Sequence, residues 1–416
     1  MGHTLKGAHA LFVFVAFAVL AGPGAKADVI TEWNARAGRV LVGANSGPGF
    51  ANCVRAVVQT AVYEAVNAIT RRYPESGLGL RASRTASINA AVAAANRAVL
   101  VKQVPLQKHT IDSMYQAAIA SIADGQAKTE GIAIGEEAAA AVIANRAEDN
   151  WAASECYRPF TAPGVYVPTV IPMATEFPKR KPWIMTSTAQ FRPGPPPELT
   201  SDVWARDYNE IQALGRKNSI RRSPAQTEIA LFWEETMPPI YDGLVASVAE
   251  MPGREVTENA RMFAVVAQAG DDAIIAVMEA KYHYNFWRPI TAIRNGDIDG
   301  NNTTERDSDW SPLISTPLHP EYPCAHCIMS GVVGTILEAE IGDGPMPVLS
   351  TTSAAAGGAR RTWKSIKDFI QEVANARVYD GVHFRNSTVV GTNMGKQIGG
   401  LAVARYLKPN PKGSDR

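Results

Sequence analysis

The sequence is short of cysteine and of net charge. Its 416 residues include only 4 cysteines, which is too few for a fold held together by disulfides. The formal net charge is +1, so the composition gives no support to nucleic acid or an anionic membrane surface as a partner. Any positive charge that serves function must therefore be concentrated locally.

Long apolar runs are scarce as well. The most apolar stretch, residues 10–21, follows Lys6 and precedes Ala-Lys-Ala at 25–27, a small-x-small cleavage pattern. This layout predicts a secretory signal peptide over residues 1–27 and is too short for a membrane span. No later run is long enough to cross a membrane. We therefore expect a periplasmic or secreted protein without a membrane span.

Alternation of apolar and polar residues, the pattern of half-buried strands, is missing over any convincing length. Apolar residues repeat at helical spacing over residues 51–66. Three further Ala-rich stretches carry no internal proline: residues 86–101, 107–123 and 130–146. Small side chains on several helices imply close packing. We predict an all-α fold with an N-terminal helical bundle over residues 28–157.

Residues 158–200, by contrast, are dense in proline, which excludes a continuous helix. Aromatic residues lie between the prolines, which is unusual for a flexible linker. We predict an extended segment that wraps over the helices and could form a wall of a substrate entrance. We assign residues 201–416 to a C-terminal helical bundle. Its expected helices are 201–214, one that starts at a capping box at 223–226 and runs toward Met237, and 257–284.

Cationic residues gather in three short stretches of this second bundle, residues 281–289, 323–326 and 377–383. Burying such a cluster is costly unless an anion lies within it. We therefore predict a tightly bound tetrahedral oxyanion. The cluster consists of Lys281, Arg288, His326, Arg377 and His383.

The spacing of these residues predicts how they are presented. Lys281 and Arg288 are seven apart, which predicts one shared helix face, with a boundary near Pro289. The aromatic residues around them favour burial over a solvated face. Arg377 and His383 are six apart and would diverge on one helix, so a break at Gly381 is expected to turn both toward one point.

Residues 324–326 end a Pro-rich loop and precede an apolar helical run. This places them at a helix N-terminus, where free backbone N–H groups favour an anion. His326 could exchange protons with a bound oxygen ligand there. In contrast, residues 296–302 only superficially resemble a calcium loop and are expected to form a polar surface turn.

The ordered motifs K-x6-R-P, P-x-x-H and R-x5-H resemble those of the vanadium-dependent haloperoxidases and type 2 phosphatidic-acid (acid) phosphatases. The phrases YNFWRPITAIRNGD, HPEYPCAHC and RVYDGVHFRNST look most like the bacterial haloperoxidase branch. The resemblance covers roughly the second half of the chain. It implies the helical-bundle fold of that superfamily and a vanadate cofactor, whose site phosphate can also occupy.

The resemblance also implies a role for each matching residue. His383 would be the protein ligand of vanadium, and His326 the acid–base group. Lys281 would polarise the bound peroxide. The oxygens of vanadate would be held by Lys281, Arg288, Arg377, Cys324 and Ala325. His319 would lie in the halide pocket, where it favours bromide or iodide over chloride.

Several positions depart from the family pattern. Cys324 and Ala325 replace the usual Ser-Gly before the catalytic histidine, so a weaker donor and an added methyl group face the anion. Ser387 stands four residues after His383, where many members have an orienting Asp, so we expect the usual orienting carboxylate to be missing. Met278 stands where relatives often place a Trp near the halide.

Four functions are consistent with these residues. We predict a vanadate-dependent haloperoxidase that uses hydrogen peroxide and a halide. An acid phosphatase that cleaves small phosphate esters through His383 is the closest alternative. The Cys324-x-x-Cys327 motif allows a thiol–disulfide oxidoreductase, although the βαβ pattern of such enzymes is missing. An inactive oxyanion-binding protein is the fourth. Two disulfides, Cys53–Cys156 and Cys324–Cys327, and the oligomeric state stay open.

Overall fold

The computed structural model describes residues 28–45, 47–150 and 157–406. Helices dominate these residues: α1 (Val29–Gly43), α2 (Pro48–Thr70), α3 (Ile88–Gln103), α4 (Lys108–Ala120), α5 (Gln126–Asn145), α6 (Asp202–Leu214), α7 (Pro224–Phe232), α8 (Pro239–Ala249), α9 (Val256–Tyr284), α10 (Pro289–Arg294), α11 (Ala325–Ile341), α12 (Ile366–Tyr379) and α13 (Arg385–Tyr406). Three 3-10 turns accompany them: η1 (Pro105–Gln107), η2 (Phe177–Lys179) and η3 (Gly296–Ile298). The predicted signal peptide, residues 1–27, lies outside the described residues.

A single antiparallel hairpin supplements the helices. Strands β1 (Leu349–Ser353) and β2 (Ala359–Trp363) pair Leu349 with Trp363 and Ser353 with Ala359. The prediction of an all-α fold is therefore confirmed apart from these two short strands. Among the described residues, we find no helix whose length and hydropathy would let it span a bilayer.

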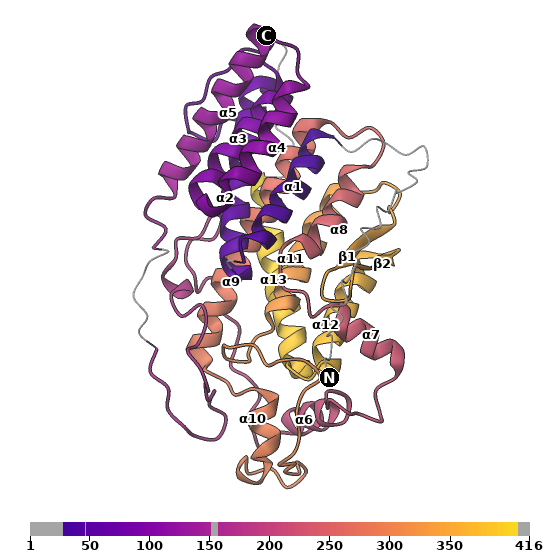
Figure 1. Cartoon of the computed structure of the whole chain (residues 1–416). Coiled ribbons are helices and arrows are strands. Elements are labelled where there is room, and N and C mark those ends of the chain that lie inside the picture. The colour runs from indigo at the N-terminus through magenta and orange to yellow at the C-terminus, as the bar shows by residue number, and fades with distance from the viewer. Residues whose placement is uncertain (1–27, 46, 151–156, 407–416) are drawn as a thin grey trace, which may run out of the picture.

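Figure 1 shows α2 to α5 gathered at one end of the molecule and α6 and α10 at the other. Between these ends run α9, α11 and α13, and the hairpin lies to one side. The long helix α9 packs against α2 at the first end and against α11 and α13 further along.

Helices α6 and α7 begin where the sequence predicts. The hydroxyl of Ser201 accepts from the backbone N–H of Trp204 at the start of α6. Ser223 and Gln226 form the expected reciprocal capping box at the start of α7. The helix from this box ends at Phe232, however, earlier than predicted.

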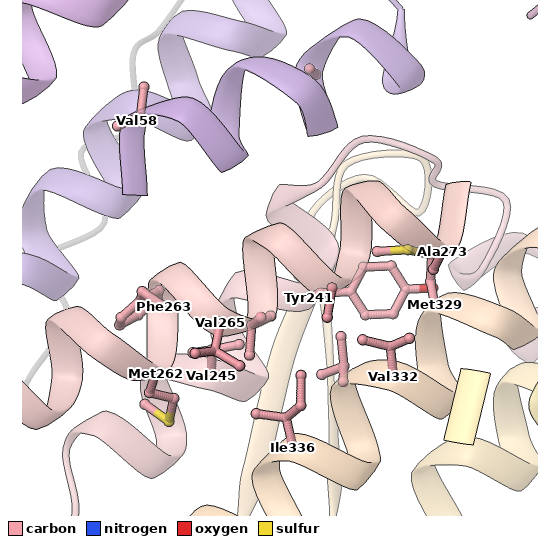
Figure 2. Close-up of a cluster of buried hydrophobic side chains, with 14 of the residues drawn as sticks. Val58, Tyr241, Val245, Met262, Phe263, Val265, Ala273, Met329, Val332 and Ile336 are labelled. Atoms are coloured by element: carbon pink, nitrogen blue, oxygen red, sulfur yellow. The ribbon is translucent and has the colours of Figure 1, made fainter. Parts of the chain in front are cut away.

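The core is built from both predicted bundles. Figure 2 shows Val58 of α2, Phe263 of α9 and Val332 of α11 among the side chains of one buried cluster. These side chains are all but fully buried. The apolar faces of the two halves therefore share one hydrophobic core, and the domain boundaries near residues 157 and 200 stay a prediction.

The Pro-rich segment lies along α9, as its aromatic content indicates. Tyr166 donates its backbone N–H to the carbonyl of Asn285 at 2.8 Å. Arg180 forms a fully buried ion pair with Asp271 at 2.8 Å. The carboxylate of Asp272 accepts backbone N–H groups from this segment, including that of Ile184 at 2.8 Å. These contacts hold the extended segment against α9.

Close packing of α13 on α11 positions the functional residues. A Cβ atom on Gly391 would lie 2.5 Å from the carbonyl oxygen of Cys324, and one on Gly395 would lie 2.1 Å from that of Ile328. Only glycine permits this approach of the two backbones. The N-terminus of α11 is thereby held against the first turns of α13, next to His383.

Candidate functional site

The three cations of the predicted cluster come from three different places and are all buried. Lys281 lies in the last turn of α9, Arg288 directly precedes α10, and Arg377 lies in the last turn of α12. None of them exposes more than 1% of its surface. The prediction that they are buried is confirmed.

The prediction that Lys281 and Arg288 share one helix face is wrong. Helix α9 ends at Tyr284, and Asn285 has a left-handed backbone with φ of 49°. Asn tolerates this conformation and commonly ends a helix. Arg288 is therefore the N-cap residue of the next helix, with Pro289 at its first position.

Lys281 and Arg288 hold the loop before α11. The ammonium of Lys281 donates to the carbonyl oxygens of Pro320 at 3.0 Å and Glu321 at 2.6 Å, which leaves one of its three N–H groups. The guanidinium of Arg288 donates to the carbonyl of His319 at 2.8 Å and to that of Val382 at 2.9 Å. The two cations thus fix the segments that carry His319 and His383.

His383 is oriented by a carboxylate that the sequence reasoning missed. Its Nδ1 lies 2.8 Å from Oε1 of Glu321, which also accepts the backbone N–H of Phe384 at 3.0 Å. Ser387 is only a distant neighbour, with its hydroxyl 3.5 Å from Nδ1. The expectation of a missing orienting carboxylate is therefore wrong, because Glu321 supplies it from another loop.

This contact defines the state of the His383 ring. A carboxylate accepts, so Nδ1 carries the proton and Nε2 keeps its lone pair. Burial lowers the pKa of His383 well below its ordinary value, and the charges of Arg288 and Lys281 lower it further. Nε2 lies 3.4 Å from a nitrogen of Arg288. The ring is thus neutral, and among the described residues the lone pair of Nε2 accepts only this long contact from Arg288.

Arg377 is held by a second carboxylate that the sequence reasoning did not use. It forms an ion pair with Asp380 at 2.9 Å and donates to the carbonyl of Trp233 at 2.8 Å. Its buried Nε makes no hydrogen bond to the described residues. Gly381, with φ of 86°, interrupts the helical conformation after α12 as predicted and lets His383 turn back toward Arg377.

The N-terminus of α11 completes the cluster as predicted. Cys324 is the N-cap residue, and its sulfur accepts the backbone N–H of Cys327 at 3.3 Å. Ala325 is the first residue of the helix. Nε2 of His326 lies 3.2 Å from the carbonyl of Glu235, so it donates there and leaves Nδ1 as an acceptor. Burial lowers the pKa of His326 well below its ordinary value, and Arg377 adds to this.

A cavity of about 370 Å³ opens onto these residues. Its polar wall contains His319, Ala325, His326, Arg377 and His383. Much of the remaining wall is apolar and includes Ile274, Met278 and Met329, together with Met173, Ala174 and Phe177 of the Pro-rich segment. That segment therefore does form part of the wall. Lys281, Arg288 and Cys324 are buried and lie outside this lining, although Arg288 contacts two lining residues and Cys324 adjoins a third in the chain.

The charges in the site favour a bound anion. Burial raises the pKa of Glu321 to about 7 and that of Asp380 to about 6, although nearby cations oppose both shifts. Burial, and then Arg288, lower the pKa of Lys281 well below its ordinary value, and burial lowers that of Arg288 to about 10. Burial thus disfavours charges of both signs, and three cations (Lys281, Arg288 and Arg377) face two carboxylates (Glu321 and Asp380), which suits a bound anion with several oxygens. The donors present therefore fit vanadate or phosphate.

The other predicted features have limited roles. Cys324 and Cys327 are buried and free, and Cys53 is also free, while its suggested partner Cys156 lies outside the described residues. Residues 296–302 form η3 and a turn in which Asp299 is buried and accepts from the indole of Trp204 at 2.8 Å. Among the described residues, no group of His, Cys, Asp and Glu is arranged to hold a metal ion on its own.

The comparisons with known proteins match the part of the chain that carries the three motifs. Residues 261–410 match the family model of the VCPO second helical-bundle domain. The vanadium chloroperoxidase of Curvularia inaequalis is 30% identical over 142 residues, and the match covers 28% of this chain and 23% of that protein. The chain thus matches less than a quarter of the length of this curated relative.

Solved structures extend the similarity to most of the chain. A bacterial vanadium-dependent iodoperoxidase superposes with a TM-score of 0.77 at 23% identity and covers 92% of this chain and 98% of its own. A holo-type bacterial vanadium-dependent chloroperoxidase gives 0.69 at 18% identity, with 87% and 94% covered. At these identities the likeness shows a common fold.

Proposed function

We propose that the protein is a vanadate-dependent haloperoxidase, because residues 261–410 match the family model of the VCPO second helical-bundle domain and the chain shares the fold of bacterial vanadium-dependent haloperoxidases. It would use hydrogen peroxide to oxidise a halide to hypohalous acid. We propose bromide or iodide rather than chloride, because His319 lies in the cavity wall.

One observation carries this proposal. His383 presents an unprotonated Nε2 to a site with excess positive charge, while Glu321 holds its other nitrogen at 2.8 Å. A neutral imidazole with one nitrogen bound to a carboxylate is the usual state of a histidine that ligates a metal. The cations around it match the negative oxygens of vanadate.

The residues of the chain would divide the work as follows. Nε2 of His383 would bind vanadium. The remaining N–H of Lys281, the guanidinium groups of Arg288 and Arg377 and the backbone N–H groups at the start of α11 would bind the oxygens. When bound, vanadate supplies the Lewis-acidic centre that activates peroxide.

Proton transfer is assigned to His326. Its Nε2–H is donated to the carbonyl of Glu235 at 3.2 Å, so Nδ1 is free to accept a proton from hydrogen peroxide and return it to a departing oxygen. The low pKa of this ring keeps it unprotonated at neutral pH, the state that a general base needs.

The cavity also supports a choice among halides. Arg288 donates toward Nδ1 of His319 at 3.0 Å, and this fixes the ring at the wall. Met278 and Met329 add soft thioether surfaces. Bromide and iodide are more polarisable and less strongly hydrated than chloride, so they suit this partly apolar cavity best.

An acid phosphatase is the second candidate, and the same histidine favours it. A neutral His383 with Nδ1 held by a carboxylate is also a competent nucleophile toward phosphorus. His326 would then protonate the leaving oxygen of a small phosphate ester. Because vanadate and phosphate have nearly the same shape, the residues around the anion suit both.

Paired assays on one preparation distinguish the candidates. The protein is purified without phosphate, loaded with orthovanadate and tested for oxidation of bromide and iodide by hydrogen peroxide. The vanadate-free protein is tested for aryl-phosphate hydrolysis. We expect halide oxidation and little hydrolysis. Hydrolysis without halide oxidation would make the haloperoxidase proposal wrong, and tight binding of either anion without turnover would indicate an inactive anion-binding protein.

We also propose that the protein acts in the periplasm or outside the cell. The support is the signal-peptide pattern of residues 1–27. The proposed substrates are small and diffusible, so neither a membrane nor nucleic acid is required as a partner. Size-exclusion chromatography with light scattering would give the oligomeric state, and N-terminal sequencing of the exported protein would test cleavage before Asp28.

A further inference from the structure

Cys324 and Cys327 form a pair of buried thiols at the N-terminus of α11. Neither exposes any surface, and the sulfur of Cys324 folds over the first turn to accept the N–H of Cys327 at 3.3 Å. The two side chains are also hydrogen-bonded to each other. Residues three apart at a helix start are neighbours, and a disulfide needs Cα atoms roughly 4.4–6.8 Å apart. The pair can therefore be bridged with small side-chain rotations.

Backbone contacts hold both cysteines in place, so a disulfide would form by rotation of the two side chains. The N–H of Cys324 donates to the carbonyl of Ser387 at 3.2 Å, and its carbonyl accepts from Ile328 at 3.1 Å. Gly391 packs directly on the same peptide. Formation of a bond between the sulfurs would thus change the side chains of the cap and leave α11 and α13 in place.

The pair lies directly beside the anion site. Both thiols pack against Ala374, which precedes Arg377 by one turn of α12. Ala325, the residue after Cys324, lines the cavity. Cys324 is thus the neighbour of a lining residue, so an oxidant formed or bound in the cavity would be close to this pair of thiols.

The two sulfurs also differ in reactivity. Burial raises the pKa of Cys324, but the hydrogen bond from Cys327 and the charge of Arg377 outweigh it, so the pKa lies below its ordinary value. Burial and the Cys324 sulfur raise the pKa of Cys327 well above its ordinary value. This is the pattern of an attacking thiol and a resolving thiol.

We propose that Cys324 and Cys327 are an oxidation site, which hydrogen peroxide or hypohalous acid in the adjacent cavity converts into an intramolecular disulfide that weakens anion binding. The role of hypohalous acid rests on the proposed haloperoxidase function. The reaction with peroxide does not depend on it.

The chemistry is a two-electron oxidation of the dithiol. The Cys324 sulfur attacks the halogen of hypohalous acid, which breaks the O–halogen bond and gives a sulfenyl halide and hydroxide. The Cys327 sulfur then attacks the Cys324 sulfur, halide leaves, and the thiol protons end on hydroxide and solvent. In sum, two thiols and hypohalous acid give a disulfide, water, halide and a proton. With peroxide, the products are a disulfide and two waters.

Oxidation should weaken the anion site through the lost S–H group. A bound oxyanion favours the protonated form of Cys324, because two negative charges repel each other. The thiol is then a donor toward the anion, and the disulfide has none. We expect the affinity for inorganic phosphate to fall about fivefold on oxidation, the effect of one hydrogen bond.

The test follows thiols and binding in the same full-length protein. Reduced protein is treated with hydrogen peroxide alone, or with vanadate, bromide and peroxide together. Peptide mapping by mass spectrometry then assigns each cysteine, and calorimetry measures phosphate binding before and after dithiothreitol. Cys327→Ala removes the resolving thiol, Cys324→Ser keeps a capping oxygen, and Cys53→Ser is the control at a remote thiol.

In wild type and Cys53→Ser, we expect a loss of 2 Da on the peptide that contains both thiols and a fivefold weaker phosphate affinity that dithiothreitol reverses. Neither Cys327→Ala nor Cys324→Ser should show the 2 Da loss. If both thiols stay reduced while bromide is oxidised, the haloperoxidase proposal holds and the oxidation site is refuted. If peroxide alone forms the disulfide and no halide is oxidised, the oxidation site holds and the proposed activity fails. A disulfide that leaves phosphate affinity unchanged would also contradict the inference.

Discussion

Glu321 Oε1 and His383 Nδ1 lie 2.8 Å apart, although 62 residues separate them in the sequence. Both side chains are almost completely shielded from solvent. The carboxylate fixes the ring plane and assigns the proton to Nδ1, so Nε2 points its lone pair at the cations. The reactive state of His383 is thus set by a residue from the loop before α11.

Removing the carboxylate of Glu321 should weaken the binding of vanadate. We expect Glu321→Ala to lower vanadate affinity by about 10–100-fold, the usual effect of losing an outer partner of a metal ligand. Glu321→Gln keeps an acceptor near Nδ1 and should lose less. Calorimetric titration with orthovanadate measures both, and Glu338→Gln, on the exposed face of α11, is the matched control. Vanadate affinity within twofold of wild type in Glu321→Ala would refute this role.

The two histidines should separate binding from proton transfer. We expect His383→Ala to abolish vanadate retention after gel filtration, because the bond to vanadium is lost. His326→Ala should retain vanadate and lose about 10²–10⁴-fold in turnover, the usual contribution of a general acid–base group. Vanadium analysis and halide oxidation rates give the two readouts, with His109→Ala as an exposed control. Loss of vanadate from His326→Ala alone would reverse the assignment.

Asp380 should matter for stability before any ligand binds. The side chain of Asp380 is completely buried and forms an ion pair with Arg377 at 2.9 Å. Without this carboxylate, Arg377 would lose its partner in that ion pair. Removing one member of a buried pair typically costs about 3–5 kcal/mol, so we expect Asp380→Asn to lower the free energy of unfolding by this amount.

Urea unfolding without phosphate or vanadate tests this prediction. Asp297→Asn is the control, because its ion pair with Arg306 is 3.6 Å long and exposed. It should change the unfolding free energy by less than about 0.5 kcal/mol. Equal effects of the two substitutions would show that the Asp380–Arg377 pair contributes no special stability.

Lys281 predicts a pH dependence of the anion-free protein. Its pKa in the folded state lies well below the ordinary value of 10.5, chiefly because of burial and then of Arg288. At a pH between the pKa of Lys281 in the folded state and its pKa in the unfolded chain, the unfolded chain binds more protons than the folded protein. Lys281 therefore makes the free energy of unfolding rise with pH up to about 10.5. We expect Lys281→Met to flatten the rise.

Urea unfolding at pH 7 to 10 measures the difference between the two slopes. Lys217→Met, at an exposed position after α6, should follow the wild-type curve. An unchanged slope in Lys281→Met would contradict the assignment of a lowered pKa to the buried Lys281 ammonium. Addition of phosphate should reduce the difference between wild type and variant slopes, because the anion favours the charged lysine.

Much of this site could be predicted from the sequence because its chemistry is carried by local motifs. The positions of Cys324 and His326 at a helix start followed from the loop prolines and the apolar run after them. The break at Gly381 followed from the spacing of Arg377 and His383. Each of these inferences depends only on neighbouring residues, for which helix geometry is a reliable guide.

What the sequence did not give concerns helix ends and contacts between distant segments. The seven-residue spacing of Lys281 and Arg288 suggested one helix, but Asn285 ends α9 between them. Glu321 stands in the printed motif HPEYPCAH, yet nothing in its neighbours shows that it reaches His383 from another loop. The shared core of the two bundles, with Val58 against the C-terminal helices, likewise depends on tertiary packing that periodicity does not contain.

The most direct test of the central claim is a titration of the anion-free protein with orthovanadate while bromide oxidation by hydrogen peroxide is recorded. We predict no activity at the start, a rise that saturates at one vanadate per chain, and no rise in His383→Ala. Absence of bromide and iodide oxidation at saturating vanadate, in a protein that binds the anion, would contradict the account.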